Sequence, residues 1–215
     1  ALPNLYVADG HHRTASAAKV GLKRREQFPD YNGDEEFNYF MAVIFPDNQL
    51  KIYDYNRVVK DLNGLTADEF LAKIAEKWNV TPIPEGANFA PQKKHNISMY
   101  LDGKWYRLEP KPGTWNEKNI VEDLDVSILQ NNLLNPILGI KDPRTDQRID
   151  FIGGIRGLDE LVKRVDSGKE AVAFAMYPTS MDELLGIADA GEIMPPKSTW
   201  FEPKLRSGLF IHLLK

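Results

Sequence analysis

The apolar positions of the chain recur with two spacings. Runs rich in β-branched and aromatic residues predict strands, and apolar residues three and four positions apart predict amphipathic helices. The predicted strands cover residues 5–8, 37–45, 50–55, 97–101, 105–108, 148–152, 171–176 and 209–213. The predicted helices cover about residues 12–27, 66–78, 123–133, 158–165 and 180–191. We expect the run over residues 5–8 to be buried and the run over residues 37–45 to be a central strand.

Short motifs mark the boundaries of several of these elements. Asp102-Gly103 separates two strand-like runs, and an Asp-Gly pair in that position is a strong signal for a β-hairpin. Thr66 and Ser180 are each followed three residues later by a glutamate, which is the capping-box pattern at the start of a helix.

The helices and strands are interleaved, but not in a regular strand-helix-strand repeat. This order predicts a fold in the range from α/β to α+β, with a mixed sheet and interleaved helices. A proline-rich loop over residues 82–93 is the best candidate for a boundary between domains. We therefore predict one segment over residues 1–80 and a second α+β region over residues 81–215, with one continuous domain as the alternative.

The composition excludes several classes of protein. Apolar residues make up 42% of the 215 residues, which is enough for a buried core. The absence of cysteine excludes disulfides, thiolate nucleophiles and cysteine-based zinc sites. The formal net charge of -4 and the pI of about 5.6 argue against a nucleic-acid partner.

Hydropathy and the first residues of the chain indicate where the protein is located. No apolar run approaches the ~18 residues needed to span a bilayer, and no signal peptide is visible, so we expect a cytoplasmic protein without a membrane partner. The chain opens on Ala1 and reaches its most suggestive motif almost at once. We therefore expect it to be a C-terminal portion of a longer protein.

The most suggestive motif is the turn between the first predicted strand and the first predicted helix. Here Gly10 precedes the helix, whose N-terminus leaves backbone N–H groups without partners and carries about half a positive charge. A glycine lets an anion approach the backbone closely, and the planar guanidinium of Arg13 suits phosphate oxygens. These features predict a phosphate-binding turn.

The other polar residues of the turn extend this interpretation. His11, His12 and Thr14 are further donors to a bound phosphate. Asp9 has three possible roles: it caps the helix, orients a histidine, or holds the Mg²⁺ that accompanies a nucleotide. The plain alternative is an ordinary aspartate cap with two surface histidines. Adjacent histidines on a helix make a poor chelating pair, so we expect no zinc site, and nothing in the sequence points to a haem.

Several motifs spread along the chain resemble the bacterial and archaeal family called domain of unknown function 1015. The resemblance is carried by the Asp-Gly-His-His-Arg turn and by the proline-containing tail. It covers residues 9–17, 45–47, 55–59, 187–192, 194–204 and 207–209.

This family resembles, more distantly, the ParB/sulfiredoxin-like fold, in which free-serine kinases share a similar turn. The resemblance implies that residues 9–13 contact the phosphates of ATP or ADP with Mg²⁺, and that the general base belongs to an upstream segment. His11 stands where sulfiredoxins have a cysteine, which excludes their redox chemistry. ParB proteins have a Gly-Glu-Arg-Arg turn, of which only Gly10 and Arg13 match here.

A second candidate region lies in the tail. Lys197, Ser198 and Thr199 follow two prolines and offer a cation and two hydroxyls, which is a reasonable anion-binding set. The alternative is a rigid turn that places Trp200 and Phe201 in the core. The isolated carboxylates Glu109, Asp123 and Asp125 are expected to be surface groups or caps.

Two functional hypotheses follow, from different classes. The leading one is a phosphate- or nucleotide-binding protein, with a small-molecule kinase acting on a serine-type hydroxyl as its enzymatic form. In that form Asp9, His11 and His12 are the catalytic candidates, and Gly10, Arg13, Thr14 and the tail residues 197–199 are the nucleotide-binding candidates. The rival hypothesis is a regulatory module that binds a phosphorylated ligand without chemistry.

Overall fold

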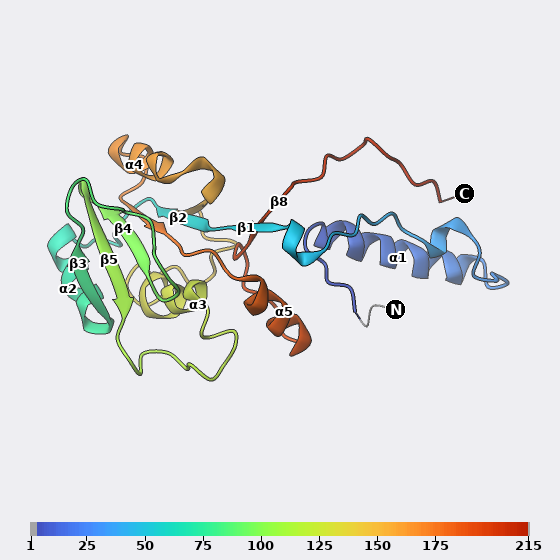
Figure 1. Cartoon of the computed structure of the whole chain (residues 1–215), viewed down its shortest axis with the longest axis horizontal. Coiled ribbons are helices and arrows are strands. Elements are labelled where there is room, and N and C mark those ends of the chain that lie inside the picture. The colour runs from blue at the N-terminus through green and yellow to red at the C-terminus, as the bar shows by residue number, and fades with distance from the viewer. Residues whose placement is uncertain (1–3, 215) are drawn as a thin grey trace. The chain divides into compact units, whose positions relative to one another are not determined.

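The computed structural model describes residues 4–214, and the chain forms two compact units. Unit 1 contains the first 51 residues together with the tail from Phe201, and unit 2 contains residues 52–200. Figure 1 shows both units and labels most of their helices and strands. The chain passes between the units in β1 (Lys51–Tyr53) and β8 (Trp200–Glu202), which form a two-stranded sheet.

Unit 2 is built on a six-stranded sheet in the order β3-β5-β4-β7-β2-β6. All of its pairings are antiparallel, so the predicted mixed sheet is an antiparallel one and the fold belongs to the α+β class. The strands are β2 (Tyr55–Val59), β3 (Trp78–Pro82), β4 (Ile97–Leu101), β5 (Lys104–Pro110), β6 (Ile149–Gly153) and β7 (Val172–Ala175).

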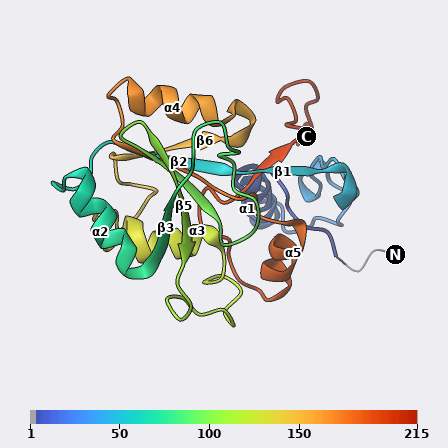
Figure 2. The ribbon, with the colours of Figure 1, turned by 60° about the vertical axis from the view of Figure 1, so that its left-hand side comes forward.

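Helices cover both faces of this sheet, as Figures 1 and 2 show from two sides. One face carries α2 (Ala67–Lys77), α5 (Met181–Asp189) and α3 (Asp125–Leu129), which continues into a π-helical turn, Gln130–Leu134. The other face carries α4 (Leu158–Asp166). The sheet is therefore the middle layer of three.

The alternation of side chains along the central strands separates the two cores. In β4, Met99 faces the core with α2 and α3, whereas its neighbour Tyr100 faces the core with α4. In β7, Phe174 likewise faces the core with α2 and α3, and Ala173 faces the core with α4. Successive side chains of a strand point to opposite faces of the sheet. A strand that lies between two helical layers therefore needs apolar side chains on both of its faces.

Unit 1 contains the long helix α1 (His11–Gln27) and two short 3₁₀ turns, Glu36–Asn38 and Asp47–Gln49. Gly21 is the buried residue of α1, and a Cβ built there would lie 2.9 Å from the carbonyl oxygen of Phe37. Arg25 Nε donates to Asn38 Oδ1 at 2.7 Å, and the rings of Phe28 and Phe37 stack at 6.2 Å. The helix is therefore held against the segment that follows it.

Three strand predictions in unit 1 are wrong. Residues 5–8, 37–45 and 209–213 form no strand, and the predicted buried and central runs are largely exposed, as at Leu5 (65%), Ile44 (63%) and Ile211 (78%). The physical reason is that a strand needs a hydrogen-bonded neighbour. Within residues 4–214 none of these segments joins a sheet, although their residue types favour β-structure.

The predictions that rest on local signals are confirmed. Asp102 and Gly103 turn β4 into β5, and both capping boxes form, with Glu69 N donating to Thr66 Oγ1 at 3.3 Å and Glu183 N donating to Ser180 Oγ at 3.1 Å. All five predicted helices are present, to within a few residues at their ends. Residues 82–93 form a loop inside unit 2, and a division of the chain at residue 80 remains a prediction. No helix of residues 4–214 is both long enough and apolar enough to cross a membrane.

The capping box of α2 gives a direct test of the fold. Thr66→Ala removes the acceptor for Glu69 N, and we expect it to lower the free energy of unfolding by about 1 kcal/mol, measured by urea denaturation. The matched control Thr66→Ser keeps a hydroxyl at the same position and should lose much less. Equal stability of the alanine variant and the parent protein would contradict the capping role.

Candidate functional site

The start of α1 has the local structure that the sequence predicts for an anion-binding turn. Gly10 is the N-cap residue and adopts the left-handed conformation, with φ 78° and ψ 26°, which glycine tolerates without strain. No side chain caps the helix, and the first turn contains no acidic residue. Among residues 4–214, no side chain accepts from the N–H groups of His11, His12 and Arg13, the first three residues of the helix.

Arg13 folds back over the turn instead of extending away from it. A Cβ built at Gly10 would lie 3.2 Å from Arg13 Nη2 and 3.3 Å from its Nε, so the guanidinium lies directly against the glycine. Arg13 Nη1 donates to Ser207 Oγ at 3.2 Å. The absence of a side chain at Gly10 is what leaves room for this guanidinium.

Asp9 does not cap the helix, which removes one of the three roles considered for it. Its Oδ1 accepts from Gly10 N at 2.7 Å, and its Oδ2 accepts from Lys204 Nζ at 3.1 Å. Partial burial acts to raise the pKa of Asp9, but the hydrogen bonds from Lys204 and Gly10, with the charges of Lys204 and Arg13, outweigh it and lower the pKa below its usual value. Asp9 is therefore a carboxylate that ties the turn to the tail.

Lys204 and Ser207 also belong to this site, although the sequence did not predict them as site residues. They lie about 190 positions from the turn in the chain, as their contacts with Asp9 and Arg13 show, so no local pattern connects them. The signal that could have found them is the family resemblance, since both lie within the tail motif. The structure thus brings two cations, Arg13 and Lys204, to one turn.

His11, His12 and Thr14 occupy the first turn of α1. Both histidine side chains are exposed and Thr14 is half-buried, so neither histidine is sealed in apolar packing. Thr14 N donates to Gly10 O at 2.9 Å and closes the first helical turn. The arrangement leaves the two imidazoles open to solvent and to a ligand.

The tail residues 197–199 belong to unit 2, where Lys197 is exposed, Thr199 is half-buried and Ser198 is buried. Ser198 is buried, and its hydroxyl donates to the carbonyl oxygen of Pro195 at 2.6 Å, which fits the rigid-turn alternative. Phe201 is buried, at 3% exposure. Lys197 is exposed and places its ammonium over the ring of Tyr55 at 5.4 Å.

A second polar cluster lies in unit 2, around the start of α3. Lys94 Nζ donates to Asp123 Oδ2 at 2.5 Å and pairs with Glu183 Oε1 at 2.8 Å. Asp123 Oδ1 accepts from Trp115 Nε1 at 2.8 Å and lies 3.0 Å from His95 Nε2. The expectation that Asp123 is an isolated surface group is therefore wrong, because the loop before β4 brings a lysine and a histidine to it.

Asp125 also differs from its expected role as a surface group. It is 8% exposed, and its Oδ1 accepts from His95 N at 2.9 Å. His95 has a φ of 63°, a conformation uncommon for a residue with a side chain. Burial raises the pKa of Asp125 to about 6, although the hydrogen bond and the nearby charges of His95 and Lys94 act in the opposite direction.

This raised pKa predicts a pH dependence of stability. A carboxyl group that binds its proton more tightly when folded contributes stability that is complete below pH ~4 and is lost as the pH rises through about 6. We expect this contribution to be on the order of 3 kcal/mol. Asp125→Asn keeps an acceptor for His95 N and removes the titration, so the free energy of unfolding, measured by urea denaturation from pH 4 to 7, should fall less than in the parent protein. Identical pH profiles would contradict the assignment.

Together, the fold and the turn define an α+β protein with a glycine-capped helix N-terminus flanked by an arginine and a lysine. The model of the family described as "Protein of unknown function (DUF1015)" matches residues 1–127. The chain belongs to this family. A comparison with curated proteins gave no match.

Several solved structures are similar to the chain. A free serine kinase in complex with AMP has 16% identity and a TM-score of 0.44, over 90% of this chain and 66% of the kinase chain. A variant of a free serine kinase, also with AMP, has 17% identity and a TM-score of 0.46 over the same shares. A conserved hypothetical protein from Pyrococcus furiosus has 16% identity and a TM-score of 0.46, over 90% of this chain and 68% of that protein. This chain thus spans 66% of the length of the free serine kinases.

Proposed function

We propose that the turn at Gly10 binds the phosphate group of a nucleotide or of a small phosphorylated metabolite. The observation that carries the proposal is the convergence of Arg13 and Lys204 on a helix N-terminus that no side chain caps. Backbone N–H groups, a helix dipole and a guanidinium all favour a bound oxyanion at the same point.

The local charge supports an anionic ligand, although the chain as a whole is acidic. Arg13 and Lys204 contribute two positive charges, and Asp9 contributes one negative charge. The positive end of the α1 dipole adds to this excess. A phosphate that accepts hydrogen bonds from Arg13 would displace the hydrogen bond from Arg13 Nη1 to Ser207 Oγ. That hydrogen bond is weak, because the serine hydroxyl is a neutral acceptor.

More specifically, we propose that the protein is a small-molecule kinase that acts on a serine-type hydroxyl with ATP or ADP and Mg²⁺. Arg13 and Gly10 hold the phosphates, and the exposed imidazoles of His11 and His12 donate hydrogen bonds to the transferred group. The sequence resemblance to free-serine kinases, which share the turn, supports this form. The resemblance identifies no general base among the residues of the turn.

Mg²⁺ fits this turn as a companion of the nucleotide and not as a resident ion. Magnesium is commonly held by one or two carboxylates together with substrate phosphates, and Asp9 is the carboxylate in reach of the turn. Within residues 4–214 no group of three or more His, Cys, Asp or Glu side chains could hold a metal ion. When bound, the ion would neutralise charge on the phosphates, while Asp9 would exchange its contact with Lys204 for one with the metal.

Binding is tested by calorimetric titration of the protein with ADP and Mg²⁺. Arg13→Ala removes a charge-assisted donor and should weaken the affinity by roughly 10- to 100-fold, whereas Arg13→Lys should keep part of it. The matched control Lys19→Ala removes an exposed cation from the same helix and should leave the affinity unchanged. Equal affinity of the parent protein and Arg13→Ala would overturn the phosphate site.

Catalysis is tested separately, by following phosphoryl transfer from ATP or ADP to free serine with ³¹P NMR. The kinase form predicts transfer that slows at least about tenfold in His12→Asn or His11→Asn, with ADP affinity retained. Binding of ADP without transfer to any hydroxyl acceptor would favour the regulatory module, which is the second candidate function.

A further inference from the structure

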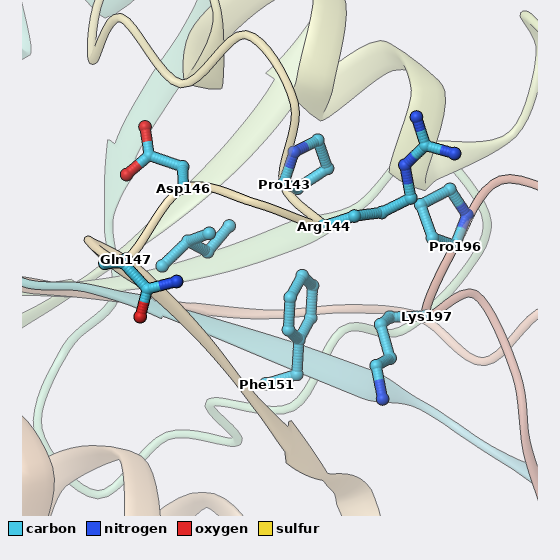
Figure 3. A pocket seen from close by; sticks show the side chains of 8 residues that line it. Pro143, Arg144, Asp146, Gln147, Phe151, Pro196 and Lys197 are labelled. Atoms are coloured by element: carbon cyan, nitrogen blue, oxygen red, sulfur yellow. The ribbon is translucent and has the colours of Figure 1, made fainter.

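Unit 2 contains a pocket of about 280 Å³ beside the turn that precedes β8. Figure 3 shows the ring of Phe151 between Gln147 and Lys197, with Pro143 and Arg144 on the other side of the pocket. The lining thus combines an aromatic ring and prolines with cationic side chains. This volume lies just below the about 300–1,000 Å³ typical of small-molecule sites, so the pocket suits a small ligand.

A buried arginine lies behind the wall of this pocket. Arg57, on β2, is 4% exposed and packs over the ring of Phe151, with its Cζ 5.6 Å from the ring centroid. Its Nη2 donates to the carbonyl oxygen of Lys197 at 3.0 Å, and its Nη1 donates to the carbonyl oxygen of Tyr55. Two residues that line the pocket, Phe151 and Lys197, are therefore positioned by one guanidinium.

The charge of Arg57 is not paired with a carboxylate in direct contact. Within residues 4–214 its hydrogen-bond partners are carbonyl oxygens, and Asp125 and Asp54 act on it only through the longer-range field. A guanidinium withdrawn from water without a paired anion is costly, because carbonyl dipoles replace only part of its hydration. The fold nevertheless places a second cation, Lys197, beside it.

Lys197 is similarly without a carboxylate partner among the described residues. Its ammonium lies 3.5 Å from the hydroxyl of Tyr55 and 5.4 Å from the centre of the same ring. Its backbone has a φ of 56°, in the left-handed region that residues with side chains seldom adopt. The turn is held in this conformation by the hydrogen bond from Arg57 to the carbonyl oxygen of Lys197, and the ammonium of Lys197 lies over Tyr55.

The acidic residues of the pocket region do not compensate these cations. Asp146 pairs with Arg148 at 2.9 Å, and Asp142 pairs with Arg144 at 2.9 Å, each within its own loop. After these pairs are formed, the cations that remain at the pocket are Lys197 at the rim and Arg57 behind Phe151. Asp125 and Asp54 offset part of the charge of Arg57 from a distance, so the positive charge that remains at the pocket lies mainly on Lys197.

We propose that this pocket binds a small organic oxyanion, a carboxylate or phosphate group carried on a flat apolar body. The oxyanion would lie against Lys197, where it compensates the charges of Lys197 and Arg57, and the apolar body would pack on the ring of Phe151 and on Pro143 and Pro196. The site shares no residue with the turn at Gly10 and lies wholly within unit 2. It is a second ligand site, independent of the proposed phosphate-binding turn.

The test uses four probes that separate charge from shape. Benzoate and phenyl phosphate carry an oxyanion on a ring, benzyl alcohol carries a ring without charge, and inorganic phosphate carries charge without a ring. In ¹H–¹⁵N NMR titrations of the chain, we expect both ring anions to shift the amides of residues 149–151, 197 and 198. The tighter of the two identifies the natural headgroup as carboxylate or phosphate. Benzyl alcohol and inorganic phosphate should bind at least about tenfold more weakly than that anion.

Substitution at the rim assigns the charge to one side chain. Lys197→Met should weaken binding of the ring anion at least about tenfold, Lys197→Arg should retain it, and the exposed control Lys169→Met should bind like the parent protein. The proposal is overturned if benzyl alcohol binds as well as benzoate and phenyl phosphate, if neither ring anion binds, or if Lys197→Met keeps full affinity. None of these results bears on ADP binding at Arg13, so the two sites fail or succeed separately.

Discussion

Burial of β2 on both faces is the constraint on which most of unit 2 depends. Val58 packs in the core with α4, and Val59 packs in the core with α2 and α3, so this strand joins the two apolar layers. The same strand also holds polar residues out of water. Asn56 Oδ1 accepts from Met176 N at 2.8 Å, and Arg57 donates to the carbonyl oxygen of Lys197 at 3.0 Å. Since a buried polar group costs free energy unless it is hydrogen-bonded, these contacts determine where the chain after β7 runs.

Net charge gives a poor description of how charge is distributed over this protein. The chain carries a formal charge of -4, but its tertiary contacts gather cations at two places, Arg13 with Lys204 in unit 1 and Arg57 with Lys197 in unit 2. Elsewhere, as in the pairs of Asp142 with Arg144 and of Asp146 with Arg148, opposite charges cancel locally. The local positive charge affects a nearby anion more than the total net charge does, because water and salt screen distant charges.

The elements predicted correctly are those whose signals are local. The capping box at Thr66 and the hairpin turn at Asp102 involve residues within three or four positions of each other, so they can be found without knowledge of the rest of the fold. The run over residues 37–45 shows the opposite case. Its composition favours a strand, but strand formation depends on a neighbour that composition cannot supply, and within the described residues it has none. Asp125 was misjudged for the same reason, since its burial and its contact with His95 depend on the packing of α3.

The sequence by itself determined that helices and strands are interleaved, that a long helix follows Gly10 and which residue types stand at the turn, because these follow from periodicity and from neighbouring residues. The antiparallel pairings of the sheet, which place the fold in the α+β class, are tertiary. The tertiary structure decided which distant side chains join that chemistry. It brought Lys204 and Ser207 to Asp9 and Arg13, and it gave Ser198 a buried hydrogen bond within its own turn. It also placed the guanidinium of Arg57 behind Phe151. Such contacts link residues far apart in the chain, and only the packing of the whole fold brings them within hydrogen-bonding distance.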